Sequence, residues 1–379
     1  MKTLLVLLTS IAGLTVAAPV ERFYLGTYPG GPVRDGIYTG TLDSRTGKLG
    51  RLELAATNAA NFLALTASGK YLYANTGGKV PDLIAYRVEP DGRLTWLNQL
   101  PCGNGTCHVS VDATGGHVFV ANYSGGDVAS FLTTNNGSLN SKAAGLHFEG
   151  SGPNPKRQNH PYLHATYLDS GNRHLYACDL GTDSVWIFDF DARSGKLTPA
   201  TPPAAKVPPG SGPRHLAFSP DEKFIYVNGE MGLNVTAFGR APDTGALTAI
   251  QTVSTLPADA ETNGITTAEI FCHPSGKWLY VSNRDTLGKG NDSLAVFAIG
   301  KDGRLNRVQN SPAQVKVPRG FGLDPSGQWL IVGGQMDHKL AVHQIDAATG
   351  KLSFTGQTAE VNSPVCVIFA PDSNSRRKF

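Results

Sequence analysis

The tripeptide Gly-x-Leu recurs seven times along the 379 residues, and each copy is accompanied by a hairpin-like pattern of short apolar strands. The copies end at Leu49, Leu94, Leu139, Leu197, Leu247, Leu305 and Leu352. Their spacing runs from 45 residues (Leu49 to Leu94) to 58 residues (Leu139 to Leu197). Repeats of this length with about four short strands per unit are typical of the blades of a β-propeller. The sequence therefore predicts an all-β, seven-bladed β-propeller whose loops meet at one central channel.

The two ends of the chain are expected to complete one blade together. Residues 365–369 have the pattern of an innermost strand with no partner downstream, and residues 23–27 and 36–40 supply the missing partners. Such closure leaves no unpaired edge in the ring. We therefore expect one propeller domain over residues 19–372, followed by a flexible tail at 373–379.

The first 18 residues have the features of a secretory signal peptide. Lys2 precedes an apolar run from Leu4 to Val16, and small residues follow at a possible cleavage site. Sequons for N-glycosylation, which also arise by chance, lie at Asn104, Asn122, Asn136, Asn234 and Asn291. No later segment is apolar enough for a membrane span. The sequence predicts a secreted, extracellular protein, and a net charge of +3 gives no indication of a nucleic-acid partner.

The five cysteines do not have the spacing of a zinc site. Cys102 and Cys107 flank a short Gly-containing loop and can form a local disulfide in an oxidising compartment. Cys178, Cys272 and Cys366 lie in apolar strand patterns, so we expect buried thiols there.

Ionisable residues recur where the inner strand of a blade begins and where the second strand ends. In an antiparallel hairpin these two positions are neighbours. The construction places Arg214 beside Glu230 and His164 beside Asp179. It also pairs Glu269 with Asn283 and Arg284, Arg319 with Gly333 and Gln335, and His108 with Asn122 and Tyr123. Five consecutive blades are therefore expected to direct such groups to one end of the channel.

The residue types at this end are chemically complementary. Arg214, Arg284 and Arg319 can bind a carboxylate, a phosphate or an oxyanion, whereas the acids and His164 can exchange protons. A single Arg–Glu pair on a propeller rim is more often structural, but repetition at equivalent positions favours a site for a small anionic molecule. His215 is predicted to point to the opposite face and to be structural.

Two inserts, residues 141–163 and 255–268, precede inner strands and are candidates for a lid or a substrate wall. His160, in the first insert, is equally compatible with loop packing and with substrate contact.

Four of these stretches resemble one family in order along the chain. They are Pro161–His164 with Asp179–Asp183, Gly212–His215 with Glu230, Ala268–Ile270 with Ser282–Arg284, and Pro318–Phe321. They resemble the seven-bladed lactonase family, which includes the bacterial propeller type of 6-phosphogluconolactonase and the fungal carboxy-cis,cis-muconate cyclase. The resemblance covers essentially the whole chain after residue 18.

The resemblance implies a catalytic set of one His, one Glu and two Arg. At matching positions these are His164, Glu230, Arg214 and Arg284. The substrate-binding candidates are Arg319, Glu269, His160, Asp179 and His108. No metal and no cofactor are implied.

Three functions are compatible with these residues. The first is hydrolysis of a sugar-acid type lactone, and the second is lactone formation from a muconate-type substrate by a cycloisomerase. The third is a non-catalytic secreted glycoprotein or adhesin. A protein-binding propeller of the WD type is disfavoured, because none of the four Trp residues is followed by Asp. The sequence leaves the oligomeric state open.

Overall fold

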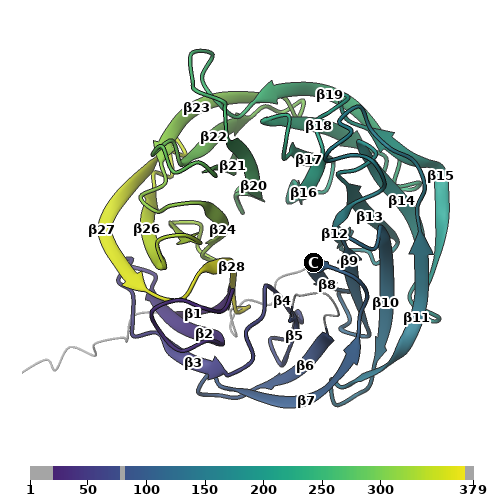
Figure 1. Ribbon diagram of the computed structural model, residues 1–379, viewed down its shortest axis with the longest axis horizontal. Coiled ribbons are helices and arrows are strands. Elements are labelled where there is room, and N and C mark those ends of the chain that lie inside the picture. The colour runs from purple at the N-terminus through teal and green to yellow at the C-terminus, as the bar shows by residue number, and fades with distance from the viewer. Residues whose placement is uncertain (1–19, 77–81, 372–379) are drawn as a thin grey trace, which may run out of the picture.

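The computed structural model describes residues 20–76 and 82–371, so the predicted signal peptide (1–18) and tail (373–379) lie outside the described residues. The described part contains 28 strands and no helix. The strands form seven four-stranded antiparallel sheets, which Figure 1 shows as blades around a common axis. The predicted seven-bladed propeller is therefore confirmed.

Six blades follow the chain, each from its innermost strand outward. They are β4 (Phe62–Leu65), β5 (Tyr71–Asn75), β6 (Asp82–Val88) and β7 (Leu94–Pro101); β8 (Thr106–Val111), β9 (His117–Asn122), β10 (Asp127–Thr133) and β11 (Leu139–His147); β12 (Leu163–Leu168), β13 (His174–Asp179), β14 (Ser184–Asp191) and β15 (Lys196–Lys206). The other three are β16 (Pro213–Phe218), β17 (Phe224–Gly229), β18 (Asn234–Arg240) and β19 (Leu247–Ser254); β20 (Ile265–Cys272), β21 (Trp278–Asp285), β22 (Ser293–Ile299) and β23 (Leu305–Pro312); β24 (Pro318–Leu323), β25 (Trp329–Gly334), β26 (Lys339–Ile345) and β27 (Leu352–Glu360).

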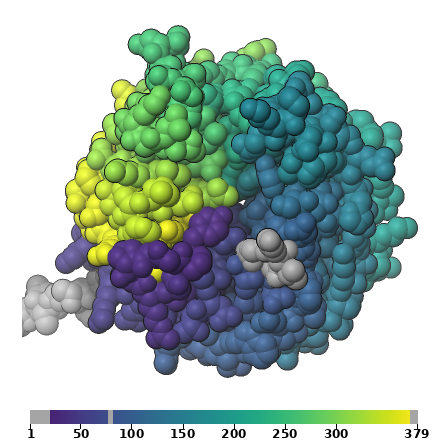
Figure 2. All heavy atoms as spheres, in the orientation of Figure 1, coloured from purple at the N-terminus to yellow at the C-terminus, as the bar shows by residue number. Residues whose placement is uncertain are grey.

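The seventh blade is built from both ends of the chain, as the sequence predicts. Its innermost strand is β28 (Pro364–Phe369), which pairs with β1 (Val20–Thr27). The blade continues outward through β2 (Ile37–Asp43) and β3 (Glu53–Ala56). In Figure 2 the purple N-terminal segment accordingly lies against the yellow C-terminal one.

The Gly-x-Leu turns require glycine for two reasons. All seven glycines have positive φ angles, between 67° and 92°, which other residues adopt only with strain. The turns also press against the preceding blade: a Cβ on Gly47 would lie 2.4 Å from the ring of Trp329, and one on Gly303 would lie 2.4 Å from the ring of Phe224.

An amide side chain of the preceding blade also holds several of these turns. Gln309 on β23 accepts a hydrogen bond from the backbone N of Leu352 (2.7 Å) and donates one to its carbonyl O (3.0 Å). Gln251 on β19 binds both backbone groups of Leu305 in the same way. We call this double contact the amide clasp. The repeated turn is therefore a joint between blades.

Seven apolar clusters fill the spaces between neighbouring blades in the described chain. In one of them Tyr176 and Ile187 pack against Leu216, Ile225 and Phe238 of the next blade. The core is thus a ring of interfaces, which leaves the innermost strands free to line the channel.

Candidate active site

The inner strands carry their ionisable residues at β-bulges. We call the channel end at which these strands begin the upper mouth, and the end at which their hairpin turns lie the lower mouth. His164 in β12 and Arg319 in β24 are each the extra residue of a bulge. In β16 the bulge contains two consecutive residues, Arg214 and His215, and in β20 it contains Glu269. Bulges re-aim side chains and are common beside active sites.

Glu230 lies at the centre of a cluster of arginines at the upper mouth. Its Oε1 accepts a hydrogen bond from Nη2 of Arg157 (2.7 Å), and its Oε2 accepts one from Nε of Arg214 (3.1 Å). Nη2 of Arg284 lies 3.3 Å from the same Oε2. Burial, with 6% of the residue exposed, raises the pKa of Glu230. The arginines outweigh burial and hold the pKa at about 2, so Glu230 is a carboxylate that binds protons poorly.

His164 is a buried, neutral imidazole beside this carboxylate. Its Nε2 lies 3.9 Å from Oε2 of Glu230, and its buried Nδ1 has no hydrogen-bond partner among the described residues. Burial, and then the charge of Arg214, lower the pKa of His164 well below its usual value. The ring is therefore unprotonated, and its Nδ1 is available as an acceptor.

His215 lies in the channel wall, so the prediction that it faces away is wrong. Its Nδ1 is 2.7 Å from Oε1 of Glu269, and its Nε2 is 3.1 Å from Nη1 of Arg214. The error has a physical cause. In a regular strand consecutive side chains point to opposite faces of the sheet, whereas the bulge turns the side chains of Arg214 and His215 to the same side. Burial raises the pKa of Glu269 to about 7.

His108 lies beside His215 and is also displaced from its predicted position. It pairs with Ala121, because Cys107 is the extra residue of the bulge in β8. The His108 and His215 rings are 5.3 Å apart. His108 is therefore buried beside His215, and it lines the same cavity as Glu269.

Asp179 does not belong to the cluster. Its carboxylate accepts hydrogen bonds from the backbone N of Tyr162 and Gly181 and from the side chains of Thr182 and Trp186. The residue is fully buried. Asp179 therefore stabilises the local turn, and its role as a substrate contact stays a prediction.

Arg284 and Arg319 complete the cations of the upper mouth. Nη2 of Arg284 donates to the carbonyl O of Thr267 (3.0 Å), and its Nε is buried without a partner among the described residues. Burial lowers the pKa of Arg284 to about 9. The guanidinium of Arg319 lies over the ring of Tyr28, 5.8 Å from its centroid. Within the described ranges Arg319 has no ion pair.

The first insert contributes a residue that sequence reasoning missed. Strand β11 extends to His147, so the free loop begins at residue 148 rather than at 141. From this loop Arg157 contacts Glu230 and donates to the hydroxyl of Tyr123 (3.2 Å). The ring of His160 packs against that of Tyr162 in a tilted arrangement, with ring centroids 3.9 Å apart. The only sequence signal for Arg157 is its place in the predicted insert.

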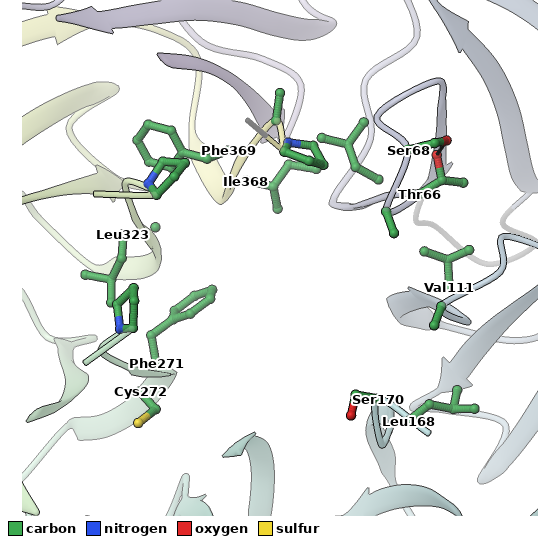
Figure 3. A pocket seen from close by; sticks show the side chains of 18 of the residues that line it. Thr66, Ser68, Val111, Leu168, Ser170, Phe271, Cys272, Leu323, Ile368 and Phe369 are labelled. Carbon is green, nitrogen blue, oxygen red and sulfur yellow. Dashed lines mark hydrogen bonds between the residues drawn. The ribbon is translucent and has the colours of Figure 1, made fainter. Parts of the chain in front are cut away.

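The channel continues away from this cluster. A cavity of about 390 Å³ is lined by Phe62, His108 and Glu269, and by Phe271 and Ile368 nearer the lower mouth. A wider hollow of about 960 Å³ opens at the lower mouth, where Figure 3 shows a mainly apolar wall around it. None of the arginines of the upper mouth lines this hollow.

Three further observations bear on the predictions. None of the five cysteines forms a disulfide within the described residues, so the disulfide that the spacing of Cys102 and Cys107 permits is absent. In the described ranges no three His, Cys, Asp or Glu side chains are grouped to hold a metal ion. No helix long and apolar enough to cross a membrane occurs in the same residues.

Comparisons with known proteins agree with this architecture. The 6-phosphogluconolactonase of Bacillus subtilis is 34% identical over 355 residues, which cover 91% of this chain and 97% of that protein. The 6-phosphogluconolactonase of Formosa agariphila is 29% identical over 351 residues, covering 89% and 96%. The solved structure of the periplasmic gluconolactonase of Pseudomonas aeruginosa superposes with a TM-score of 0.84 at 27% identity, covering 93% of this chain and 99% of that one.

The sequence also matches a protein family as a whole, in addition to these single relatives. Residues 22–369 match the family described as lactonase, 7-bladed β-propeller. These residues include all seven blades and every ionisable side chain of the upper mouth. The chain belongs to the seven-bladed β-propeller lactonase family.

Proposed function

We propose that this protein hydrolyses a lactone of the sugar-acid type at the upper mouth, with His164 as the general base. The observation that carries the proposal is the contrast between two adjacent groups. Glu230 is held as a carboxylate with a pKa of about 2, whereas His164, 3.9 Å away, is held neutral. Both oxygens of Glu230 are occupied by arginine hydrogen bonds, whereas Nδ1 of His164 has no partner among the described residues, so His164 is the group left to accept a proton from water.

The reaction needs each group in a defined role. His164 takes a proton from a water molecule, whose oxygen forms a bond to the lactone carbonyl carbon. Arg214 and Arg284 stabilise the oxyanion of the tetrahedral intermediate. The bond to the ring oxygen then breaks, and the imidazolium of His164 returns the proton to that oxygen. The product is a hydroxy acid, and Glu230 keeps the two arginines in position throughout.

The charge at the upper mouth favours an anionic substrate. Three arginines contact one ionised carboxylate, and a fourth, Arg319, has no ion pair among the described residues. The planar guanidinium of Arg319 is suited to a carboxylate or a phosphate on the substrate. The names of the relatives support sugar lactones, both phosphorylated and unphosphorylated.

We further propose that the protein is secreted, on the basis of residues 1–18. A structural relative is named as a periplasmic gluconolactonase, which is compatible with lactone chemistry outside the cytosol. Mass spectrometry of the protein recovered from the medium would give the N-terminus, and retention inside the cell would contradict the proposal.

A substrate panel tests the reaction. It comprises glucono-1,5-lactone, its 6-phosphate, a glucaric acid monolactone and 3-carboxy-cis,cis-muconate, each assayed with and without a chelator. We expect ring opening, a lower KM for the anionic lactones and no effect of the chelator. Conversion of the muconate alone would support the cycloisomerase instead, and turnover of none of them would support the non-catalytic alternative.

Variants locate the chemistry. His164→Ala is expected to lower kcat by about 10²–10⁴-fold, and Arg214→Ala by about 10²–10³-fold. Arg319→Ala is expected to raise KM for the anionic lactones only. Arg304→Ala is the matched control, because Arg304 is exposed and pairs only with Asp302 in an outer turn. Undiminished ring opening in His164→Ala and Arg214→Ala would show that the proposed site is wrong.

A further inference from the structure

Arg214 is the most completely fixed arginine at the upper mouth. Its Nε donates to Glu230, and its Nη1 donates to the carbonyl O of Ala268 (2.8 Å) and approaches Nε2 of His215 (3.1 Å). The residue is 2% exposed. No acceptor among the described residues binds its Nη2, which is left for an oxygen of the substrate.

The contact between Arg214 and His215 fixes the tautomer of the imidazole. A guanidinium can only donate hydrogen bonds, so Nε2 of His215 must accept. In a neutral ring the proton is then on Nδ1, which donates to Oε1 of Glu269 at 2.7 Å. The ring is neutral because burial, and then Arg214, lower the pKa of His215 well below its usual value.

Glu269 is itself held in place by the bulge in β20. Its backbone N donates to Oγ of Ser282 (2.9 Å), and its Oε1 accepts a second hydrogen bond from the N of Ile270 (3.1 Å). The adjacent residue of the same bulge, Ala268, supplies the carbonyl that binds Arg214. One backbone irregularity thus holds Arg214 both directly and through His215.

We propose that His215 and Glu269 are positioning residues that lock the guanidinium of Arg214, so that Nη2 points at the developing oxyanion. This inference rests on the proposed function, in which Arg214 stabilises the transition state. Neither residue needs to touch the substrate. A group that acts through an oxyanion contact affects kcat more than KM, because the contact strengthens only in the transition state.

Three substitutions of His215 separate its two contacts. Gln places an amide oxygen near the position of Nε2 and can accept a hydrogen bond from Arg214. Asn places its amide near the position of Nδ1 and can contact only Glu269. Phe keeps neither contact. We expect His215→Gln to retain kcat within about threefold. His215→Asn and His215→Phe are expected to lose about 10–100-fold with KM nearly unchanged.

A double substitution shows whether His215 affects kcat through Arg214 or through a general loss of structure. In an Arg214→Ala background, His215→Phe is expected to cause no further loss of kcat. His174→Phe is the matched control, because His174 is a buried histidine bound to Asp169 (2.9 Å) at the start of β13, beside the hairpin turn at the lower mouth. It is expected to lower the melting temperature and to leave kcat unchanged. Equal losses in His215→Gln and His215→Phe, or additive effects of Arg214 and His215 variants, would overturn the proposal.

A spectroscopic test does not depend on any substrate. In the protein with ¹⁵N-labelled histidine and arginine, the ring shifts of His215 are expected to report a proton on Nδ1 and none on Nε2. The Nε–H signal of Arg214 is expected to broaden in His215→Phe and to stay sharp in His215→Gln. A proton on Nε2 of His215 would refute the positioning pair even if the protein hydrolysed no lactone, and the correct tautomer in a protein inactive on lactones would refute only the proposed reaction.

Discussion

Arg157 and Glu230, which are 73 positions apart in the sequence, are joined by a hydrogen bond of 2.7 Å. The guanidinium comes from the loop that begins at residue 148, and the carboxylate follows the end of β17. This contact fastens the loop over the arginine cluster. The loop is therefore positioned to control access to the upper mouth.

Removal of the hydrogen bond between Arg157 and Glu230 is expected to weaken substrate binding. The side chain of Arg157 is 42% exposed, so we expect its charged hydrogen bond to contribute only about 1 kcal/mol. Arg157→Ala should raise KM by about fivefold and speed cleavage of the loop by an unspecific protease. Lys156→Ala is the control, since Lys156 is exposed on the same loop. A KM unchanged by Arg157→Ala would mean that the loop does not contribute to binding.

Glu230 is expected to make the protein sensitive to acid. Its folded-state pKa of about 2 lies below the ordinary value of 4.5. The ionised form therefore contributes stability above pH 4.5, and this contribution is lost as the pH falls towards 2. Urea unfolding at pH 7, 5 and 3 should give a steeper loss of unfolding free energy in the wild type than in Glu230→Gln. Parallel pH profiles for the two proteins would contradict the low pKa.

Glu269 is expected to have the opposite effect on how the unfolding free energy depends on pH. Its folded-state pKa of about 7 lies above 4.5, because burial disfavours the charged form. Its contribution to stability is present below pH 4.5 and is lost as the pH rises through 7. Glu269→Gln should therefore gain in unfolding free energy relative to the wild type between pH 5 and pH 8. A relative stability that is constant over this range would show that Glu269 ionises normally.

The amide clasp is expected to stabilise the ring without affecting the site. Gln309→Ala removes both hydrogen bonds to Leu352 and leaves two backbone groups unpaired, which should cost about 1–3 kcal/mol of unfolding free energy. Gln344→Ala, at an exposed position of β26, should change it by less than about 0.5 kcal/mol. Thermal unfolding together with kcat measures both effects. A lower kcat in Gln309→Ala would indicate that the blades and the site are coupled.

The fold follows from the sequence because its signal is repeated. The turn that ends at Leu305 has the same glycine conformation as the turn that ends at Leu352. Neighbouring blades must also solve the same packing problem, so one periodic pattern determines all of them. The pairing of the two chain ends is predictable for the same reason, since a ring leaves no other partner for β1 and β28.

Hairpin geometry predicts which ends of two strands meet, but not where each side chain in a bulge points. Arg214 and Glu230 are brought together as the hairpin construction predicts. His215 is misplaced because period-two alternation does not apply within a bulge. Arg157 is missed because a loop has no periodicity from which its direction can be deduced. Asp179 binds the backbone of its own turn, because a carboxylate at a strand end serves a turn as readily as a ligand.

The closing blade has a consequence for the order in which the molecule can be made. The innermost strand of this blade, β28, is encoded last, after every ionisable residue of the upper mouth. Until it emerges, the nascent chain is an open arc with an unpaired inner edge at β1. A circular permutation that joins residues 20 and 371 and opens the chain between β3 and β4 would move the junction of the two chain ends from within a sheet to an interface between blades. The new termini would lie between complete sheets. Every blade would then consist of consecutive strands, so no blade would depend on pairing between the two ends of the chain.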